Sequence, residues 1–400
     1  MPVFLLVAIS AFAAEDVVDA EDTNVVAAAQ ADDDAGWESV FTEENRVPFH
    51  INFYTEDGLY YEFMETSEFE GVFFTKVFSE KRRFTGRLGA KLHLDAAFYF
   101  QNGTLPEADN DLAVRRFRVN TFGRGFFLSP LTYGVEFGIS DGSFFFNNGY
   151  LWFHRVPYVS SVRLGIFTAP MSMESLQSSS SVPLMERAAP VSTFAPGELM
   201  GIQVGGAFPR QRGTFFAGWF ADVNDNENRG EAESYSRVMA RATWLLADNE
   251  ERGRLIHLGA SGSYMVVARD GVHYQARPES YLAPYLIDTG EGALNGDFAA
   301  TYGLEAAWQN GPLLAQGELL QSHVEDDLGA DYRFGGAYAT LSWILTGETR
   351  DYNRGSGIFS RVEPRRRFSF KERSWGAFEW AGRISYTDLS DGAIQGGEMG

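Results

Sequence analysis

Arginines that alternate with apolar residues are the side chains with the most distinctive chemistry in this chain of 400 residues. A planar guanidinium group donates two parallel hydrogen bonds to an oxyanion, so arginine is well suited to recognise carboxylate and phosphate groups. Arg116 and Arg118 share one face of an extended run with Asn120. The same alternation places further arginines on polar faces, namely Arg163, Arg237 and Arg241.

Two interpretations of these arginines stay open. In the first, they form a ladder of guanidinium groups along a water-filled passage. A positive potential with weak binding at several sites would conduct anions there. In the second, each arginine pairs with a carboxylate such as Glu136 or Glu379 and stiffens the wall of the passage.

The segment 347–374 has the most unusual charge. It contains eight basic and four acidic residues, a net charge of +4, in a chain whose formal net charge is -21. Arg365, Arg366 and Arg367 form its densest basic run. We predict that this segment draws anions into a pore. The alternatives are a solvated basic loop, or one that pairs with the acidic N-terminal residues.

A second long link, residues 169–200, is rich in serine and contains four prolines. Links of this length are usually functional or disordered. Its charged residues are Glu174, Glu186, Arg187 and Glu198, a net charge of -2. This balance opposes strong anion selectivity unless Arg187 and the arginines of the wall dominate locally.

The composition excludes several classes of function. The chain has no Cys, so thiolate zinc sites, disulfides and cysteine nucleophiles are impossible. Its six His show no paired spacing for a metal, and Ser and His form no nucleophile motif. The acidic charge opposes nucleic-acid binding, and no run of ~18 apolar residues predicts a membrane-spanning helix. We therefore predict no enzyme, no metal, no cofactor and no nucleic-acid partner.

The elements that must position these arginines are strands. From about residue 84 onward, runs of about ten residues alternate apolar with polar or small side chains, and Gly, Pro, Asn or Asp separates them. In the run 87–100, Leu88 and Phe98 share one face, whereas Lys91 and Asp95 lie on the other. Such strands build either a soluble sandwich or a membrane barrel.

Three features favour the membrane barrel. Many runs reach the ~9–11 residues that cross a bilayer on a tilt. Isolated charges on the polar face would be costly in a dry sandwich but not in a wet lumen. Aromatic residues near the ends of the runs suit the interface girdles of a barrel. These aromatic residues are Tyr133, Tyr150, Trp152, Trp219, Trp244, Tyr264, Trp308, Trp343, Trp380 and Tyr386.

The predicted fold class is therefore all-β, a transmembrane antiparallel β-barrel. We count thirteen runs, an odd number, whereas a bacterial single-chain barrel needs an even number. Residues 388–400 read as a loop with no strand after it. We therefore expect about three C-terminal strands of the barrel to be missing. Short and long links alternate, as in outer-membrane barrels, and this parity places 347–374 on the periplasmic side.

The N-terminal residues divide into three predicted parts before the barrel domain, which spans 84–400. Residues 1–13 contain an apolar run that ends in Ala-Phe-Ala, which predicts a signal peptide. Residues 14–45 form an acidic tail, predicted to be disordered because its eleven acidic and few aromatic residues cannot build a core. Residues 46–83 are predicted to form an N-terminal periplasmic segment.

Several motifs along residues 50–400 together resemble one known family. They are Arg115-Arg116-Phe117-Arg118, Gly165-Ile166-Phe167-Thr168-Ala169-Pro170, Met185-Glu186-Arg187-Ala188, Gly201-Ile202-Gln203, Thr346-Gly347-Glu348-Thr349-Arg350-Asp351-Tyr352 and Trp375-Gly376-Ala377-Phe378-Glu379. In this order they resemble the phosphate-selective porin O and P family of Gram-negative outer membranes. The resemblance implies a sixteen-stranded barrel, usually a homotrimer, in which inward-folded loops narrow the pore. It also suggests that 169–200 is the constriction loop.

The resemblance and the arginines together predict a porin, exported by its signal peptide and embedded in outer-membrane lipid. Small anions such as phosphate would diffuse passively through it. The candidate anion contacts are Arg116, Arg118, Arg163, Arg187, Arg237, Arg241, Arg365, Arg366 and Arg367. Two alternatives are a general diffusion porin without anion preference and a structural barrel that tethers the envelope.

Overall fold

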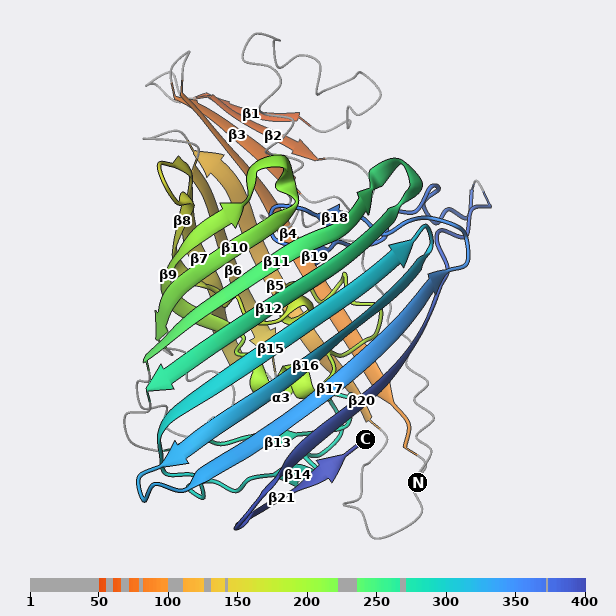
Figure 1. Ribbon diagram of the computed structural model, residues 1–400. Coiled ribbons are helices and arrows are strands. Elements are labelled where there is room, and N and C mark those ends of the chain that lie inside the picture. The colour runs from red at the N-terminus through yellow and green to blue at the C-terminus, as the bar shows by residue number, and fades with distance from the viewer. Residues whose placement is uncertain are drawn as a thin grey trace. The chain divides into compact units, whose positions relative to one another are not determined.

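A computed structural model describes residues 50–54, 60–65, 72–78, 82–99, 111–125, 131–140, 143–221, 236–266, 271–371 and 373–400 (Figure 1). The predicted signal peptide, residues 1–13, and the predicted acidic tail, residues 14–45, lie outside these residues. Within the described part, strands dominate and the α-helices are single short turns. No described helix is long and apolar enough to cross a membrane.

The strands belong to two compact units. We call the strands up to Phe167 the N-terminal unit and residues 168–400 the C-terminal unit. The N-terminal unit contains β1 (His50–Tyr54), β2 (Tyr60–Glu65), β3 (Val72–Phe78), β4 (Arg82–Ala97), β5 (Asp111–Gly125), β6 (Leu131–Ser140), β7 (Ser143–Val156) and β8 (Ser160–Thr168). Its recorded pairings are antiparallel, from β1 to β4 and from β5 to β8.

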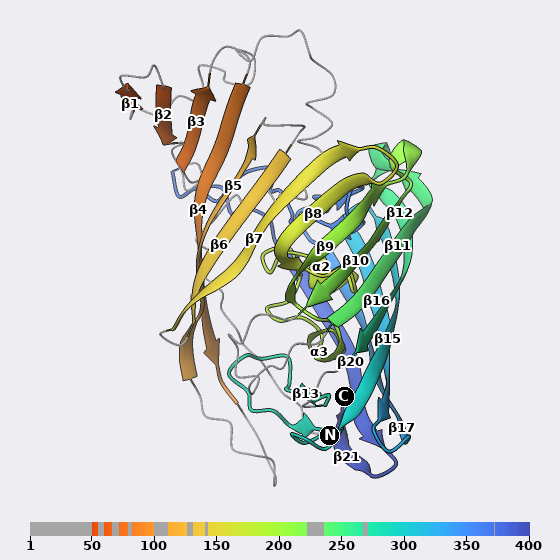
Figure 2. The ribbon, with the colours of Figure 1, turned by 90° about the vertical axis from the view of Figure 1, so that its left-hand side faces the viewer.

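The C-terminal unit is one continuous antiparallel sheet with inserted segments (Figure 2). In order of pairing, its strands are β9 (Glu198–Ala207), β10 (Gly213–Ala221), β11 (Ser236–Asn249), β12 (Arg254–Val266), β15 (Gly296–Asn310), β16 (Leu313–Asp326), β17 (Asp331–Ile344), β20 (Glu379–Asp391) and β21 (Ile394–Met399). The remaining elements are α2 (Met173–Leu176), α3 (Ala189–Phe194), η3 (Pro209–Gln211), η4 (Glu250–Arg252), β13 (Gln275–Ala276), β14 (Ile287–Asp288), β18 (Tyr352–Asn353) and β19 (Ile358–Phe359).

The predicted fold class, the antiparallel β-barrel type of all-β protein, is confirmed. The thirteen predicted runs correspond to β4–β12, β15–β17 and β20. The prediction of a loop over 388–400 is wrong, because Ile394–Met399 forms β21, which pairs with β20. This strand is short and contains two glycines, so its sequence carries little alternation. The structure also has three strands, β1 to β3, within the predicted periplasmic segment 46–83.

Many of the strands whose side chains the structure describes alternate buried with exposed residues, as the sequence pattern predicts. In β4, Lys91 and Asp95 are buried whereas Leu88 is exposed. In the C-terminal sheet the exposed face is strongly apolar. Its large exposed side chains between the strand ends include Leu258, Leu304, Leu319, Leu341 and Ile384. A contiguous exposed apolar surface of this kind is rare on soluble monomers and is the surface that a lipid-facing sheet needs.

Two rows of exposed aromatic side chains border this apolar surface. Trp244, Trp308, Trp343 and Trp380 form the first row, in which Trp343 and Trp380 are directly opposed across β17 and β20. We call the end of the sheet near this row the Trp edge. It carries the short turns 208–212, 250–253 and 311–312 and the long segment 345–378. The second row lies toward the other strand ends and contains Trp219, Tyr264, Tyr302 and Tyr386.

Two aromatic residues predicted for these girdles lie on the opposite face. Tyr150 and Trp152 of β7 are buried, at 6% and 5% exposure. Trp152 faces Arg163 of β8 across the pair, and the ring of Tyr150 lies 3.8 Å from the Arg163 guanidinium carbon. The girdle assignment is therefore wrong for these two residues, because they enclose a buried cation instead.

Inserted segments cover the buried face of the C-terminal sheet, and two of them, 169–197 and 345–360, also contact each other. Residues 169–197 bring α2 and α3 against it, with α3 beside β16, β17 and β20. Residues 345–360 bring β18 and β19 against it near the Trp edge. The two segments and the wall share one hydrophobic cluster, made of Met173, Leu245, Leu255, Ala307, Leu314, Tyr352, Ile358 and Phe359. The long links are therefore packed parts of the fold.

Gly205 in β9 provides a test of how closely neighbouring strands approach. Its φ of 143° disfavours any L side chain, and an added Cβ would lie 2.0 Å from the Phe215 carbonyl oxygen. We expect Gly205→Ala to lower the free energy of unfolding by about 1–3 kcal/mol, the usual cost of such backbone strain. Urea unfolding in lipid vesicles measures this change. Gly197→Ala is the control, because a Cβ there meets nothing within 4 Å. Equal stability of the two variants would contradict the prediction.

Candidate functional site

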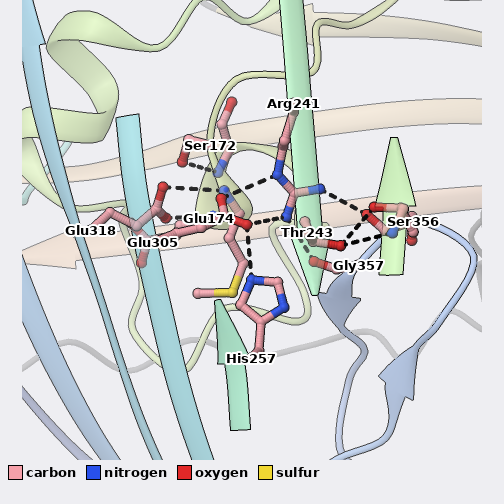
Figure 3. A network of polar contacts seen from close by, with 12 residues as sticks. Ser172, Glu174, Arg241, Thr243, His257, Glu305, Glu318, Ser356 and Gly357 are labelled. Carbon is pink, nitrogen blue, oxygen red and sulfur yellow. Dashed lines mark hydrogen bonds and ion pairs between the residues drawn. The ribbon is translucent and has the colours of Figure 1, made fainter. Parts of the chain in front are cut away.

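The buried face of the C-terminal sheet carries a network of charged side chains centred on Glu305 of β15 (Figure 3). Arg241 of β11 donates to both oxygens of this carboxylate, from Nη2 at 2.7 Å and from Nε at 3.1 Å. His257 of β12 lies 2.8 Å from Glu305 Oε1 through Nε2. Arg241 and Glu305 are 1% and 5% exposed. An ion pair this deep is tolerated only with good geometry and further hydrogen bonds, and both are present.

Gly259 explains how Arg241 and Glu305 meet although β12 lies between their strands. A Cβ at Gly259 would lie 2.2 Å from Glu305 Oε1, so only glycine leaves room for the carboxylate to cross the strand. In the sequence, such a contact is indicated by a glycine on the polar face of a strand. Gly259 is this glycine, and it pairs directly with Glu305 of the neighbouring strand.

Arg241 also holds the segment 345–360 against the wall. Its Nη1 donates to the Ser356 carbonyl oxygen at 2.8 Å, and its Nη2 donates to the Gly357 carbonyl oxygen at 2.7 Å. One guanidinium group therefore satisfies a buried carboxylate and two buried backbone acceptors. This arrangement gives Arg241 a clear role in holding the inserted segment.

Tyr352 of the same segment contacts His257 on its other ring nitrogen, with 2.7 Å between Oη and Nδ1. Burial raises the pKa of the Tyr352 phenol above its ordinary value, although Arg241 nearby opposes the shift. The Tyr352 hydroxyl and the Glu305 carboxylate therefore hold the His257 ring through its two nitrogens.

Glu318 of β16 holds the other inserted segment. Its carboxylate accepts hydrogen bonds from the Met173 N–H at 3.1 Å, the Glu174 N–H at 2.8 Å and the Tyr338 hydroxyl at 2.8 Å. The N–H groups at the start of a helical turn have no partner within the turn, so a carboxylate is well placed there. Ser172 caps the same turn by accepting from the Ser175 N–H at 3.1 Å.

Glu174 itself joins α2 to the last strands of the sheet. Its Oε1 binds Arg383 of β20, and its Oε2 accepts from the Ala188 N–H at 2.8 Å. Arg383 also donates to Glu279 Oε2 at 2.8 Å. Burial raises the pKa of the Glu174 carboxyl, and the attraction of Arg383 opposes the shift. Two carboxylates from two different links thus share one arginine of the wall.

Arg350 ties the two inserted segments together. It donates to both oxygens of Glu379, at 2.6 Å and 2.8 Å, and to the Ser181 carbonyl oxygen at 2.6 Å. Its own carbonyl oxygen accepts from Gln309 of the wall at 2.8 Å. The position of 169–197 therefore depends on 345–360, and both depend on polar residues of the strands.

The predicted arginines have several different local environments. Arg118 pairs with Glu136 at 2.9 Å, the partner considered from the sequence. Arg163 is buried among the rings of Tyr150, Trp152 and Phe167. Arg187 donates to the carbonyl oxygens of Glu174, Ser175 and Gln177. Arg116 and Arg237 are partly exposed on their strands.

Arg365, Arg366 and Arg367 are exposed, in the part of 345–378 that lies beyond the buried segment. Arg365 donates from Nη2 to the Gly347 carbonyl oxygen at 2.8 Å. The residues that the sequence predictions left out are those that hold the links, above all Glu305, Glu318, Arg350 and Arg383. The sequence shows the types of these residues and predicts the strand face on which each lies, but it does not predict their partners.

Comparison with known proteins agrees with this architecture. Residues 87–400 match the family described as phosphate-selective porin O and P. An uncharacterized protein of Caulobacter vibrioides is 26% identical over 296 residues, which cover 72% of this chain and 57% of that protein. Porin O of Pseudomonas aeruginosa is 26% identical over an alignment of 323 residues, which covers 72% of this chain and 70% of that porin.

The role of Glu318 in holding 169–197 is testable. Glu318→Gln keeps the size of the side chain but replaces one acceptor oxygen with an amide donor, so either Met173 or Glu174 loses its partner. We expect a cost of about 1–3 kcal/mol and faster amide hydrogen exchange at these two residues. Glu325→Gln, later on the same strand, is the control. Unchanged exchange in Glu318→Gln would show that the loop is held elsewhere.

The pair of Arg241 and Glu305 supports a second test. Arg241→Met leaves a buried carboxylate without its main counter-charge, so we expect a loss of about 3–5 kcal/mol in the free energy of unfolding. The double variant R241M/E305L removes both charges and should recover part of this loss. Unfolding in lipid vesicles measures both values. A double variant that is less stable than R241M would refute the proposed cause.

Proposed function

Because the chain belongs to the phosphate-selective porin O and P family, we propose that it is an outer-membrane porin through which small anions, phosphate among them, diffuse passively. The proposal includes export through residues 1–13 as a signal peptide and assembly as a homotrimer. Porins act as channels, so the proposal assigns no catalytic step to this chain.

The observation that carries the proposal is the division of the C-terminal sheet into two faces. One face is apolar, exposed and bordered by two aromatic rows, as contact with lipid requires. The other face carries hydrogen-bonded charges and the two inserted segments. A sheet with these two faces separates lipid from a polar interior.

Anion preference requires a positive potential where the solute passes. Arg116 and Arg237 are partly exposed on strand faces, and Arg365, Arg366 and Arg367 are exposed near the Trp edge. We assign the attraction of anions to these five side chains. Arg163, Arg187 and Arg241 are directed at aromatic rings, backbone carbonyl oxygens and Glu305 respectively, so we assign them to the framework of the pore.

A general diffusion porin is the second candidate, and charge pairing favours it. Arg118, Arg241 and Arg383 each lie against a carboxylate, which cancels much of their field. Under this alternative the passage would conduct small hydrophilic solutes with little preference for sign. The sign of selectivity then depends on the exposed arginines alone.

Bilayer recordings test the proposal. The full-length protein in a planar bilayer should form open channels, and a potassium chloride gradient should give a reversal potential of the sign that marks anion preference. The variant R365Q/R366Q/R367Q should shift this potential toward cation permeability, because it removes three exposed positive charges from the rim. Added phosphate should reduce the chloride current if both anions share the passage.

The matched control for this experiment is R210Q/R252Q, which removes exposed arginines from two short turns at the same edge of the sheet. Its reversal potential should equal that of the unmodified protein. Unchanged selectivity in the triple variant would show that these three arginines do not influence conduction. A protein that forms no channel would overturn the porin proposal itself.

A further inference from the structure

The exposed half of the segment 345–378 ends in a small hairpin, residues 365–375, which we call the rim hairpin. Ser369 and Ser374 close it by two backbone hydrogen bonds, of 2.9 Å and 3.0 Å. Its sequence contains five basic residues and one acidic residue, a net charge of +4. Lys371 and Arg373 lie in the turn of the hairpin and are exposed.

The rim hairpin also exposes a cluster of aromatic rings. Phe368, Phe370 and Trp375 are 54%, 85% and 70% exposed. The rings of Phe368 and Phe370 meet edge to face with centroids 4.8 Å apart, and the ring of Phe368 lies 6.2 Å from that of Trp375. Three large rings therefore pack on one another without being covered by the described protein.

The position of the rim hairpin is fixed by the Trp edge. The Leu345 N–H donates to the Phe378 carbonyl oxygen at 2.7 Å, which extends the pairing of β17 with β20 beyond Trp343 and Trp380. Phe378 is 52% exposed and lies two residues before Trp380, so the period of a strand puts both on the exposed apolar face. Phe378 thus continues the row of tryptophans. The rim hairpin lies beside this row, because it ends three residues before Phe378 and Arg365 at its start binds the Gly347 carbonyl oxygen, two residues after Leu345.

Aromatic rings and basic side chains together match the chemistry of a membrane interface. Aromatic side chains favour the level of the lipid headgroups, and each Lys or Arg near the surface is attracted to anionic lipid. We propose that the rim hairpin is a membrane anchor, in which Phe368, Phe370 and Trp375 enter the headgroup layer while Lys371 and Arg373 bind the phosphate groups of anionic phospholipids.

This inference rests on the membrane location in the proposed function and adds a partner that conduction does not require. Free phosphate carries the same chemical group as the headgroup. A small hydrated anion in a pore gains nothing from three exposed rings, whereas a lipid covers them. The attachment of the rim hairpin at the Trp edge therefore favours the phospholipid.

Quenching of Trp375 tests the anchor in the full-length protein. The difference in fluorescence between the unmodified protein and Trp375→Phe isolates the emission of Trp375. In vesicles that mix brominated phosphatidylglycerol with plain phosphatidylcholine, we expect lipid to quench this emission and aqueous acrylamide to leave it unchanged. The variant K371Q/R373Q should lower the preference for the anionic lipid by roughly 30-fold, since two charges are lost.

The variant R210Q/R252Q is again the control and should leave the quenching of Trp375 by brominated lipid in place, because neither residue belongs to the rim hairpin. Quenching of Trp375 by acrylamide but not by brominated lipid would overturn the anchor. Relief of the lipid quenching by inorganic phosphate would also overturn it and show that the hairpin takes free anions. A conducting protein without lipid quenching rejects the anchor alone, whereas a quenched protein that forms no channel rejects the porin proposal alone.

Discussion

A charge removed from water needs an opposite charge or several hydrogen bonds, and this requirement organises the interior of the C-terminal unit. Glu305 lies at 5% exposure beneath the inserted segments, where it is matched by Arg241 and His257. Arg241 then has N–H groups to spare, and these bind the carbonyl oxygens of Ser356 and Gly357. One buried carboxylate on a strand thereby determines where a link of the chain must lie.

At Glu318 the same requirement is met with the roles of link and strand exchanged. There the unsatisfied groups are the backbone N–H donors of α2, and the strand supplies the acceptor. A helical turn of 4 residues has too few internal hydrogen bonds to be stable alone. Its position therefore depends on the wall. A change of charge on this face therefore alters the geometry of the links as well as the local potential.

These dependencies explain which features the sequence could predict. Strand faces follow from a period of two, so Leu88 and Phe98 were correctly separated from Lys91 and Asp95. The thirteen runs were found because each is long and clearly alternating, whereas β21 is short and rich in glycine. Trp152 was assigned to the exposed face because its type suits a girdle, although its place opposite Arg163 decides its environment.

The partners of the charged residues could not be predicted in this way. Arg241 and Glu305 are 64 residues apart, and Arg383 and Glu174 are 209 apart. The alternation predicts that each of these side chains lies on the polar face of its strand. It does not predict which strand or link lies opposite that side chain. The choice between an arginine ladder and paired arginines is a question about such contacts, so strand pattern alone left it open.

The contacts also separate two roles that one residue type plays in the same interior. An arginine enclosed by protein acceptors, as Arg241 is, stabilises the links, and a counter-charge within 3 Å cancels much of its field. An arginine at the rim, such as Arg366, lies in water and acts over roughly a Debye length, ~8 Å at physiological salt. Under the proposed function, selectivity would therefore depend on local exposure, and the net charge of the whole chain would not predict it.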